Sequence, residues 1–363
     1  MKKHDDSPPE DFMKNCSRRR FLTGAGASAL AVGASALTLP FLRKSAHAQS
    51  AFTPPGSPTD NPPSCSDVVN IPSPNPWFIR GCCTDTVCGY NAAGITVTGV
   101  RHYCGQDRIP WGDGVTTNVG GTPFPDRPDG ASFCLTVYPI VDKLLKRNAY
   151  ANTSGYDDDL EPFFRSFQVR DMVSCWHEVA NLSAKSDLTG HVITAADARA
   201  MQHYMLNFRN NLGLTRPNFG AIECPANTNG STDFGIARCK PFMIEGLDFY
   251  GQDLYHKNFG DPTEPLKAWD KEFGSGSTYT PSGAASTATI AVAECNCETP
   301  SLRAKYFNDA AFWLWNQNNK GARCFLTFWN YSPGPNESGP WLPGDTATIA
   351  ALKAIGNGQY SNP

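Results

Sequence analysis

Short apolar runs separated by longer amphipathic segments occupy most of the chain from residue 95 onward. Each run is rich in β-branched or aromatic residues, which is typical of a buried strand. The pattern therefore predicts seven strands, at residues 95–100, 133–137, 172–176, 219–222, 242–249, 289–293 and 324–329.

The segments between these runs show helical periodicity. Residues 194–212 open with the sequence of a capping box, Thr194 to Asp197, and then place apolar side chains on one face. We expect further helices to begin near Asp159, Pro300 and Pro343. Strands that alternate with helices indicate a parallel sheet.

Seven strands spread over about 250 residues suit a closed α/β barrel of the (β/α)8 TIM type better than an open sheet. A doubly wound open sheet is the alternative. Against it, the sequence has no glycine-rich phosphate-binding turn after the first run and no P-loop.

Two of the apolar runs lead directly into a glutamate. The run at 172–176 is followed by His177 and Glu178, and the run at 289–293 ends on Glu294. A strand–helix barrel gathers its active site at the carboxyl ends of its strands, and paired carboxyl groups are what hydrolysis of a glycosidic bond requires. The alternative is that both are unrelated surface glutamates at loop starts.

The first 48 residues form a pattern of their own. Paired arginines at Arg18 and Arg19 precede a Gly/Ala-rich apolar stretch, and Ala46-His47-Ala48 ends it as a small-x-small cleavage site. This resembles a twin-arginine signal peptide, which implies passage through the twin-arginine translocase and a periplasmic or secreted product that begins at Gln49. Retention as a membrane anchor is the alternative, but the stretch has few Leu and Ile residues and no second span follows, so we expect no stable membrane insertion after cleavage.

Residues 49–76 are rich in Pro, Ser and Asn and predict a linker or extended arm, which leaves residues 77–363 for the barrel. The formal net charge of −3 offers no basic stripe for nucleic acid. Many aromatic and few charged residues, 11% and 18%, suit a secreted protein that acts on carbohydrate, although they suit other secreted proteins equally.

Twelve of the 13 cysteines lie beyond the signal segment, since Cys16 lies within it. An even number in an exported chain predicts disulfides, up to six of them. Their connectivity cannot be read from the sequence, although bridges at Cys295 and Cys297 would pin the loop beside Glu294. Metal binding is the alternative, but the close groups lack the paired C-x-x-C spacing of a structural zinc site.

Four local motifs occur in barrel order. They are Trp176-His177-Glu178-Val179-Ala180-Asn181, the D-x-x-G-x-D-x-Y pattern of Asp248 to Tyr255, Glu294, and Phe328-Trp329-Asn330. Together they resemble glycoside hydrolase family 26 and its looser relatives, retaining barrel enzymes that include β-mannanases, over roughly residues 96–354.

The resemblance implies Glu178 as acid/base, Glu294 as nucleophile, Tyr255 as the tyrosine that contacts the nucleophile, and Trp329 as the floor of the cleavage subsite. It implies a β-linked polysaccharide or oligosaccharide as substrate and no cofactor or metal. The two carboxyl groups of a retaining enzyme are about 5–5.5 Å apart.

Other residues near these motifs are candidates for substrate binding, each with a plainer interpretation. His177 and Trp176 would desolvate Glu178 and favour the protonated carboxyl that a general acid needs, but His177 also fits a buried core position. The remaining candidates are Asn181 and Asp253, which alternatively brace loops, Trp329, which alternatively packs in the core, and His102 and Tyr103 after the first run.

The motifs also depart from the family pattern. Cys295-Asn296-Cys297 follows Glu294 where the family commonly has an aromatic residue and a glycine. Glu298 and Glu245 are therefore alternative carboxylates. A second hypothesis is a catalytically inactive barrel that binds glycan or another envelope component. A cysteine or metal hydrolase is a third, but the sequence has no H-E-x-x-H motif.

Overall fold

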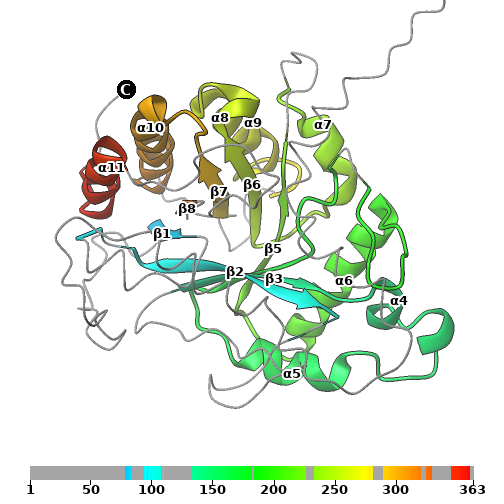
Figure 1. Cartoon of the computed structure of the whole chain (residues 1–363). Coiled ribbons are helices and arrows are strands. Elements are labelled where there is room, and N and C mark those ends of the chain that lie inside the picture. The colour runs from blue at the N-terminus through cyan, green and yellow to red at the C-terminus, as the bar shows by residue number, and fades with distance from the viewer. Residues whose placement is uncertain are drawn as a thin grey trace, which may run out of the picture.

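Eight parallel strands close into a barrel in their sequence order (Figure 1). The computed structural model describes residues 78–82, 94–109 without 96 and 108, 132–181, 184–225, 233–280, 289–319, 324–328 and 345–359. Pairing of β1 with β8 closes the barrel. The strands are β1 Phe78–Cys82, β2 Gly99–Gln106, β3 Ser132–Tyr138, β4 Met172–Cys175, β5 Asn218–Glu223, β6 Phe249–Tyr255, β7 Thr289–Asn296 and β8 Cys324–Phe328.

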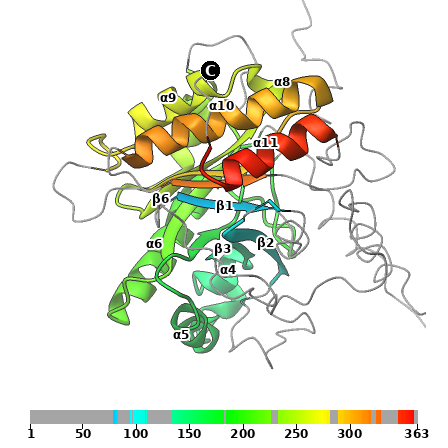
Figure 2. The ribbon, with the colours of Figure 1, turned by 90° about the vertical axis from the view of Figure 1, so that its left-hand side faces the viewer.

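Helices surround the strands on the outside of the barrel (Figures 1 and 2). Figure 2 shows α10 and α11 packed side by side next to β1. The helical segments are α4 Val141–Leu144, η2 Asn148–Tyr150, α5 Asp157–Arg165, α6 Ala195–Asn211, α7 Ile236–Cys239, η3 Lys240–Phe242, α8 His256–Phe259, α9 Thr263–Phe273, α10 Pro300–Asn319 and α11 Thr346–Gly356.

Alternation along the strands divides the core into two layers. On β6, Phe249 joins a small cluster inside the barrel, whereas Tyr250 points the other way and stacks on Phe273 of α9. The inner cluster consists of Cys134, Met172, Ile222, Phe249, Ala291, Ala293 and Phe325. The larger outer cluster lies between the strands and the helices.

The predicted barrel is confirmed, with corrections to its strands. β1 was not predicted, because its five residues include Arg80 and Gly81 and show no clear apolar run. The first strand was predicted at 95–100, but β2 begins only at Gly99 and continues to Gln106. Arg101 and Tyr103 project toward the barrel interior and interrupt the apolar pattern in its second half.

The strand predicted at 242–249 is wrong in its position. β6 begins only at Phe249, and Gly246 adopts a positive φ of 76° in the turn before it. The apolar residues Met243 and Ile244 in that segment are buried in the outer cluster, and the Ile244 amide donates to Gln202 Oε1 at 3.1 Å. The apolar run at 242–249 therefore reflects a buried loop rather than a strand.

The predicted helix starts agree with the structure more closely than the predicted strands do. α6 begins after Thr194, which caps it through a reciprocal capping box with Asp197. α10 begins at Pro300 as predicted, α5 begins two residues before Asp159, and α11 begins at Thr346, three residues after Pro343.

The predicted disulfide framework is not supported. Five cysteines are buried thiols, namely Cys134, Cys175, Cys239, Cys297 and Cys324. Removing these five from the twelve leaves seven, which is enough for at most three bridges rather than six. The bridge at Cys297 that was expected to pin the loop after Glu294 is not formed, because Cys297 is a thiol. These side chains fill core positions as small apolar groups, a common use of cysteine.

The predicted signal segment, the predicted arm at 49–76 and Trp329 lie outside the described residues. Within the part of the chain that the structure describes, no helix is long and apolar enough to cross a membrane.

Candidate active site

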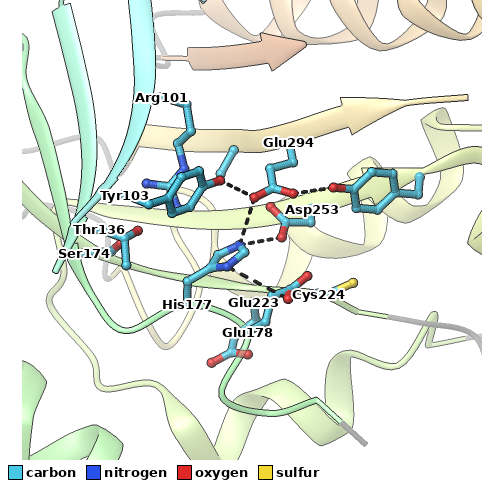
Figure 3. A network of polar contacts seen from close by, with 12 residues as sticks. Arg101, Tyr103, Thr136, Ser174, His177, Glu178, Glu223, Cys224, Asp253 and Glu294 are labelled. Atoms are coloured by element: carbon cyan, nitrogen blue, oxygen red, sulfur yellow. Dashed lines mark hydrogen bonds and ion pairs between the residues drawn. The ribbon is translucent and has the colours of Figure 1, made fainter. Parts of the chain in front are cut away.

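Polar side chains from β2, β4, β6 and β7 meet at the carboxyl ends of these strands (Figure 3). Tyr103 comes from β2, His177 follows β4, Asp253 lies on β6 and Glu294 on β7. All but Tyr103 are almost completely buried. Such a group of desolvated titratable residues is typical of an active site.

Glu294 is held by two tyrosines. Its Oε1 accepts a hydrogen bond from the Tyr103 hydroxyl and its Oε2 accepts one from the Tyr255 hydroxyl. A shift in the pairing of β6 with β7 sets Glu294 directly opposite Asp253. Two donors directed at one carboxyl group favour its ionised form, which is the form that a nucleophile needs.

His177 lies between the two glutamates. Its Nε2 shares a hydrogen bond with Asp253 Oδ2 and is 3.6 Å from Glu294 Oε1, while its Nδ1 is 3.9 Å from Glu178 Oε2. Figure 3 shows the ring directed toward Glu294 and Asp253. The fully buried imidazole of His177 therefore lies between the carboxyl group of Glu178, which follows β4, and those of Asp253 on β6 and Glu294 on β7.

Glu178 sits on a strained turn. Its φ is 53° and that of Trp176 is 60°, values that non-glycine residues seldom adopt. The turn is fixed by the Glu178 amide, which donates to the Ile222 carbonyl at 2.9 Å, and by the Asn181 amide, which donates to the Glu178 carbonyl at 3.3 Å. Strain held in place by its surroundings is common at functional sites.

Lys185 pairs with Glu178. Its Nζ is 3.3 Å from Glu178 Oε2 and donates to the His177 carbonyl at 2.8 Å. The ammonium group therefore stabilises the ionised form of Glu178.

Glu223, the last residue of β5, lies beneath the same turn. Its Oε2 accepts a hydrogen bond from the Ala180 amide at 2.8 Å, and the residue is 2% exposed. Burial raises the pKa of Glu223 to about 8, assisted by the charge of Glu178 and opposed by the Ala180 amide and Lys185. Glu223 is therefore mostly protonated at neutral pH.

Arg101 is a fully buried cation inside the barrel. Its guanidinium lies 4.2 Å from the centre of the Tyr103 ring, and its Nη1 donates to the Cys134 carbonyl at 3.1 Å. This stacking fixes the orientation of the tyrosine that contacts Glu294.

The other predicted residues take different positions. Trp176 packs edge-on against Tyr138 of β3 and donates through Nε1 to the Pro139 carbonyl at 3.0 Å, so its indole faces β3. His102 alternates with Tyr103 and shares its face of β2 with Val100, which belongs to the outer cluster. Tyr103 rather than His102 thus reaches Glu294.

The rival carboxylates lie elsewhere. Glu298 follows the end of β7 and pairs with His256 at 3.1 Å. Glu245 is exposed in the turn before β6, at the amino end of that strand. Asn181, by contrast, lies at the Glu178 turn as expected.

A metal ion would find three possible ligands in this site. His177, Asp253 and Glu294 each offer one atom, and these atoms lie within 4.8 Å of one another. In the structure the same groups already serve each other and the tyrosines as hydrogen-bond partners.

Three site residues were not identified from the sequence: Arg101, Lys185 and Glu223. Glu223 carried a usable signal, because it ends the apolar run at 219–222 just as Glu294 ends its own run. Arg101 and Lys185 gave no comparable signal, since their roles depend on which way each side chain points.

No protein-family model matches the chain, and no curated protein matches it. Solved structures are similar at low identity. An endo-1,4-β-xylanase from Penicillium canescens is 12% identical, with 77% of this chain and 95% of that chain covered and a TM-score of 0.46. An endo-β-1,4-mannanase double mutant from Cellulomonas fimi is 14% identical, with 78% and 70% covered and a TM-score of 0.40.

An oligosaccharide-binding protein of family GH128 from Cryptococcus neoformans is 10% identical, with 84% and 100% covered and a TM-score of 0.43. These proteins include glycoside hydrolases and a binding protein. All three TM-scores lie below 0.5, so the barrel fold is inferred from the strand order of this chain rather than from these similarities. Its function is likewise inferred from the residues of its own site.

Proposed function

We propose that this protein is a retaining glycoside hydrolase that cleaves a β-linked polysaccharide, with Glu178 as acid/base and Glu294 as nucleophile. The observation that supports this most strongly is the pair of nearly buried glutamates after β4 and on β7, linked by His177, with two tyrosine hydroxyls donating to Glu294. The family 26 resemblance assigns the same roles and points to a mannan-like substrate.

The reaction would proceed in two displacements. In the first, the Glu294 carboxylate forms a bond to the anomeric carbon while the glycosidic bond breaks, and Glu178 gives its proton to the departing oxygen. In the second, Glu178 takes a proton from water, the water oxygen bonds to the anomeric carbon, and Glu294 leaves as a carboxylate. No cofactor takes part in either step.

The surroundings of each glutamate fit one of these roles. Tyr103 and Tyr255 favour the carboxylate of Glu294 before attack and after release. Lys185 stabilises the Glu178 carboxylate that forms once the proton has been delivered. Asp253 fixes the His177 ring and with it the spacing between the glutamates. We further propose a carboxyl separation of about 5–5.5 Å, as double displacement requires, and Trp329 as the sugar platform.

We also propose that the protein is exported by the twin-arginine translocase, on the strength of residues 1–48. The mature chain would begin at Gln49 and carry the arm at 49–76 ahead of the barrel. Sequencing the amino terminus of periplasmic and secreted protein tests this. An Arg18→Lys/Arg19→Lys variant that is exported as well as the wild type would contradict it.

One observation favours the alternative, an inactive glycan-binding barrel. The Lys185 ammonium, 3.3 Å from Glu178 Oε2, favours the carboxylate of Glu178, whereas a general acid must start protonated. The Cys295 and Cys297 context of Glu294, which departs from the family pattern, points the same way.

An assay of new reducing ends distinguishes the two functions. Wild-type protein would be incubated with mannan, xylan and mixed-linkage glucan beside the Glu178→Ala/Glu294→Ala double variant. We expect release by the wild type alone, and full release by a Glu245→Gln variant, because Glu245 is exposed and lies away from the site. If neither the wild type nor the double variant releases reducing ends, and both migrate more slowly in gels that contain polysaccharide, the binding function is supported instead.

A further inference from the structure

A second group of metal-binding side chains lies beside the candidate active site. His256 is the first residue of α8 and directly follows Tyr255 at the end of β6. Cys297 and Glu298 directly follow Asn296 at the end of β7. These three side chains therefore gather at the carboxyl ends of two neighbouring strands.

The positions of the three side chains suit a shared ion. His256 Nδ1 is 3.1 Å from Glu298 Oε1, and the ligand atoms of all three residues lie within 4.8 Å of one another. Zinc bonds of about 2.0–2.3 Å place tetrahedral ligand atoms about 3.3–3.8 Å apart. The ligand atoms therefore lie close to the spacing of a bound site, and the His256 and Glu298 side chains are 19% and 30% exposed.

The donor atoms indicate which ion fits. A thiolate, an imidazole and a carboxylate suit Zn²⁺, whereas Mg²⁺ and Ca²⁺ prefer oxygen ligands alone. Three protein ligands leave a fourth position for water. Burial raises the pKa of the Cys297 thiol, which donates to the Thr299 carbonyl at 3.3 Å.

A buried hydroxyl next to the group provides an independent observation. The ring of Tyr306 packs edge-on against His256 at 5.5 Å, and its hydroxyl has no hydrogen-bond partner among the residues that the structure describes. Burial and the neighbouring Cys295, Cys297 and Glu298 raise the pKa of this hydroxyl well above its usual value. A buried polar atom without a partner costs about 1–3 kcal/mol, and water held by an ion beside it would remove that cost.

We propose that His256, Cys297 and Glu298 bind one zinc ion that ties the start of α8 to the loop after β7. The ion would hold the backbone next to Tyr255, whose hydroxyl contacts Glu294. The ion would thus pin the loop after β7 in place of a disulfide at Cys297. The proposal does not depend on hydrolase activity.

Cobalt titration tests this directly, because Co²⁺ bound to a thiolate gains a sulfur-to-metal absorption band in the near ultraviolet. Purified full-length protein would be stripped with EDTA and titrated with Co²⁺ under reducing conditions. We expect one equivalent to bind with the sulfur band, and Zn²⁺ to abolish the band.

Variants locate the ion. Cys297→Ser should lose the sulfur band, whereas Cys324→Ser, a buried thiol on β8, should keep it. Glu298→Gln should weaken Co²⁺ binding by at least about 10-fold, since even the loss of an outer partner costs that much. Glu294→Gln should leave the band unchanged, because the group around His177 contains no sulfur.

Three results would overturn the proposal: no bound cobalt, cobalt bound without the sulfur band, or a band that survives in Cys297→Ser. Circular dichroism would establish that each variant is folded. If Cys297→Ser does not fold, Glu298→Gln tests the site instead, because the Glu298 side chain is partly exposed and its substitution should not prevent folding. Unchanged Co²⁺ affinity in that variant would contradict the proposal.

Discussion

Two tyrosines from different strands donate to the two oxygens of Glu294, and each contact should contribute to catalysis. A hydrogen bond to a charged group is worth about 1.5–3 kcal/mol. We therefore expect Tyr103→Phe and Tyr255→Phe each to lower kcat by about 10- to 100-fold, with a smaller effect on KM. Steady-state kinetics on the best polysaccharide measures this.

Tyr250→Phe is the matched control. The Tyr250 hydroxyl donates to the Ile244 carbonyl at 2.9 Å, behind the barrel wall. Its loss should lower the melting temperature and leave kcat near the wild-type value. If Tyr103→Phe and Tyr255→Phe both keep wild-type kcat, the assignment of Glu294 as nucleophile loses its main support.

Glu223 should make the protein less stable as pH rises. Its folded-state pKa of about 8 lies above the ordinary value of 4.5, so the folded protein retains a proton that the unfolded chain has lost. Stability should therefore fall from about pH 4.5 to about pH 8, by at most about 1.4 kcal/mol per pH unit from this group.

Glu223→Gln removes that titration and keeps an oxygen that can accept from the Ala180 amide. We expect the variant to lose less stability than the wild type between pH 5 and pH 8, as measured by urea denaturation at each pH. Identical pH profiles for the two proteins would show that Glu223 is ionised in the folded state across this range.

At the residue scale the sequence singled out Glu178, Glu294, Asp253 and Tyr255, because each ends a strand or fits a motif, and the structure brings these side chains together around His177. It did not reveal Lys185, whose ion pair with Glu178 depends on how the loop after β4 folds back. Such contacts depend on side-chain direction rather than on spacing.

At the scale of elements, the clearest prediction concerns α6. The Thr194 hydroxyl accepts from the Asp197 amide, and the Asp197 carboxylate accepts from the Thr194 amide at 3.1 Å. Burial opposes ionisation of Asp197, but hydrogen bonds from Thr194, His191 and Arg147 outweigh it and lower its pKa.

Thr194→Ala should therefore cost about 1 kcal/mol of unfolding free energy, within the range of 0.5–2 kcal/mol for lost caps. Urea denaturation at neutral pH measures this. Thr215→Ala, an exposed position just beyond the same helix, should change stability by less than about 0.5 kcal/mol. Equal effects of the two substitutions would mean that the cap contributes nothing specific.

Elements were predicted well where periodicity and capping agree, as in α6, and poorly where the barrel interior carries polar groups. β2 contains Arg101 and Tyr103 on its inner face, so no apolar run marks its second half. The segment before β6 is apolar because it is a buried loop. Hydrophobicity reports burial, and burial alone does not distinguish a strand from a packed turn.

At the scale of the whole molecule, barrel closure creates the site. Tyr103 and Glu294 lie 191 residues apart in sequence and share a hydrogen bond. The alternation of strands and helices predicted this closure, and with it the meeting of β4 and β7 carboxyl ends. The cysteines could not be predicted in the same way, because a thiol that fills a core position and one that forms a bridge look alike in sequence.

Trapping the covalent intermediate tests the central claim most directly. The protein would be incubated with an activated 2-deoxy-2-fluoro-β-glycoside of the sugar released in the polysaccharide assay, and its intact mass and labelled peptide determined. We predict one added glycosyl group, attached to Glu294 and absent from Glu294→Gln. A label on another carboxylate, or turnover of the natural substrate with inversion at the anomeric carbon, would contradict the account.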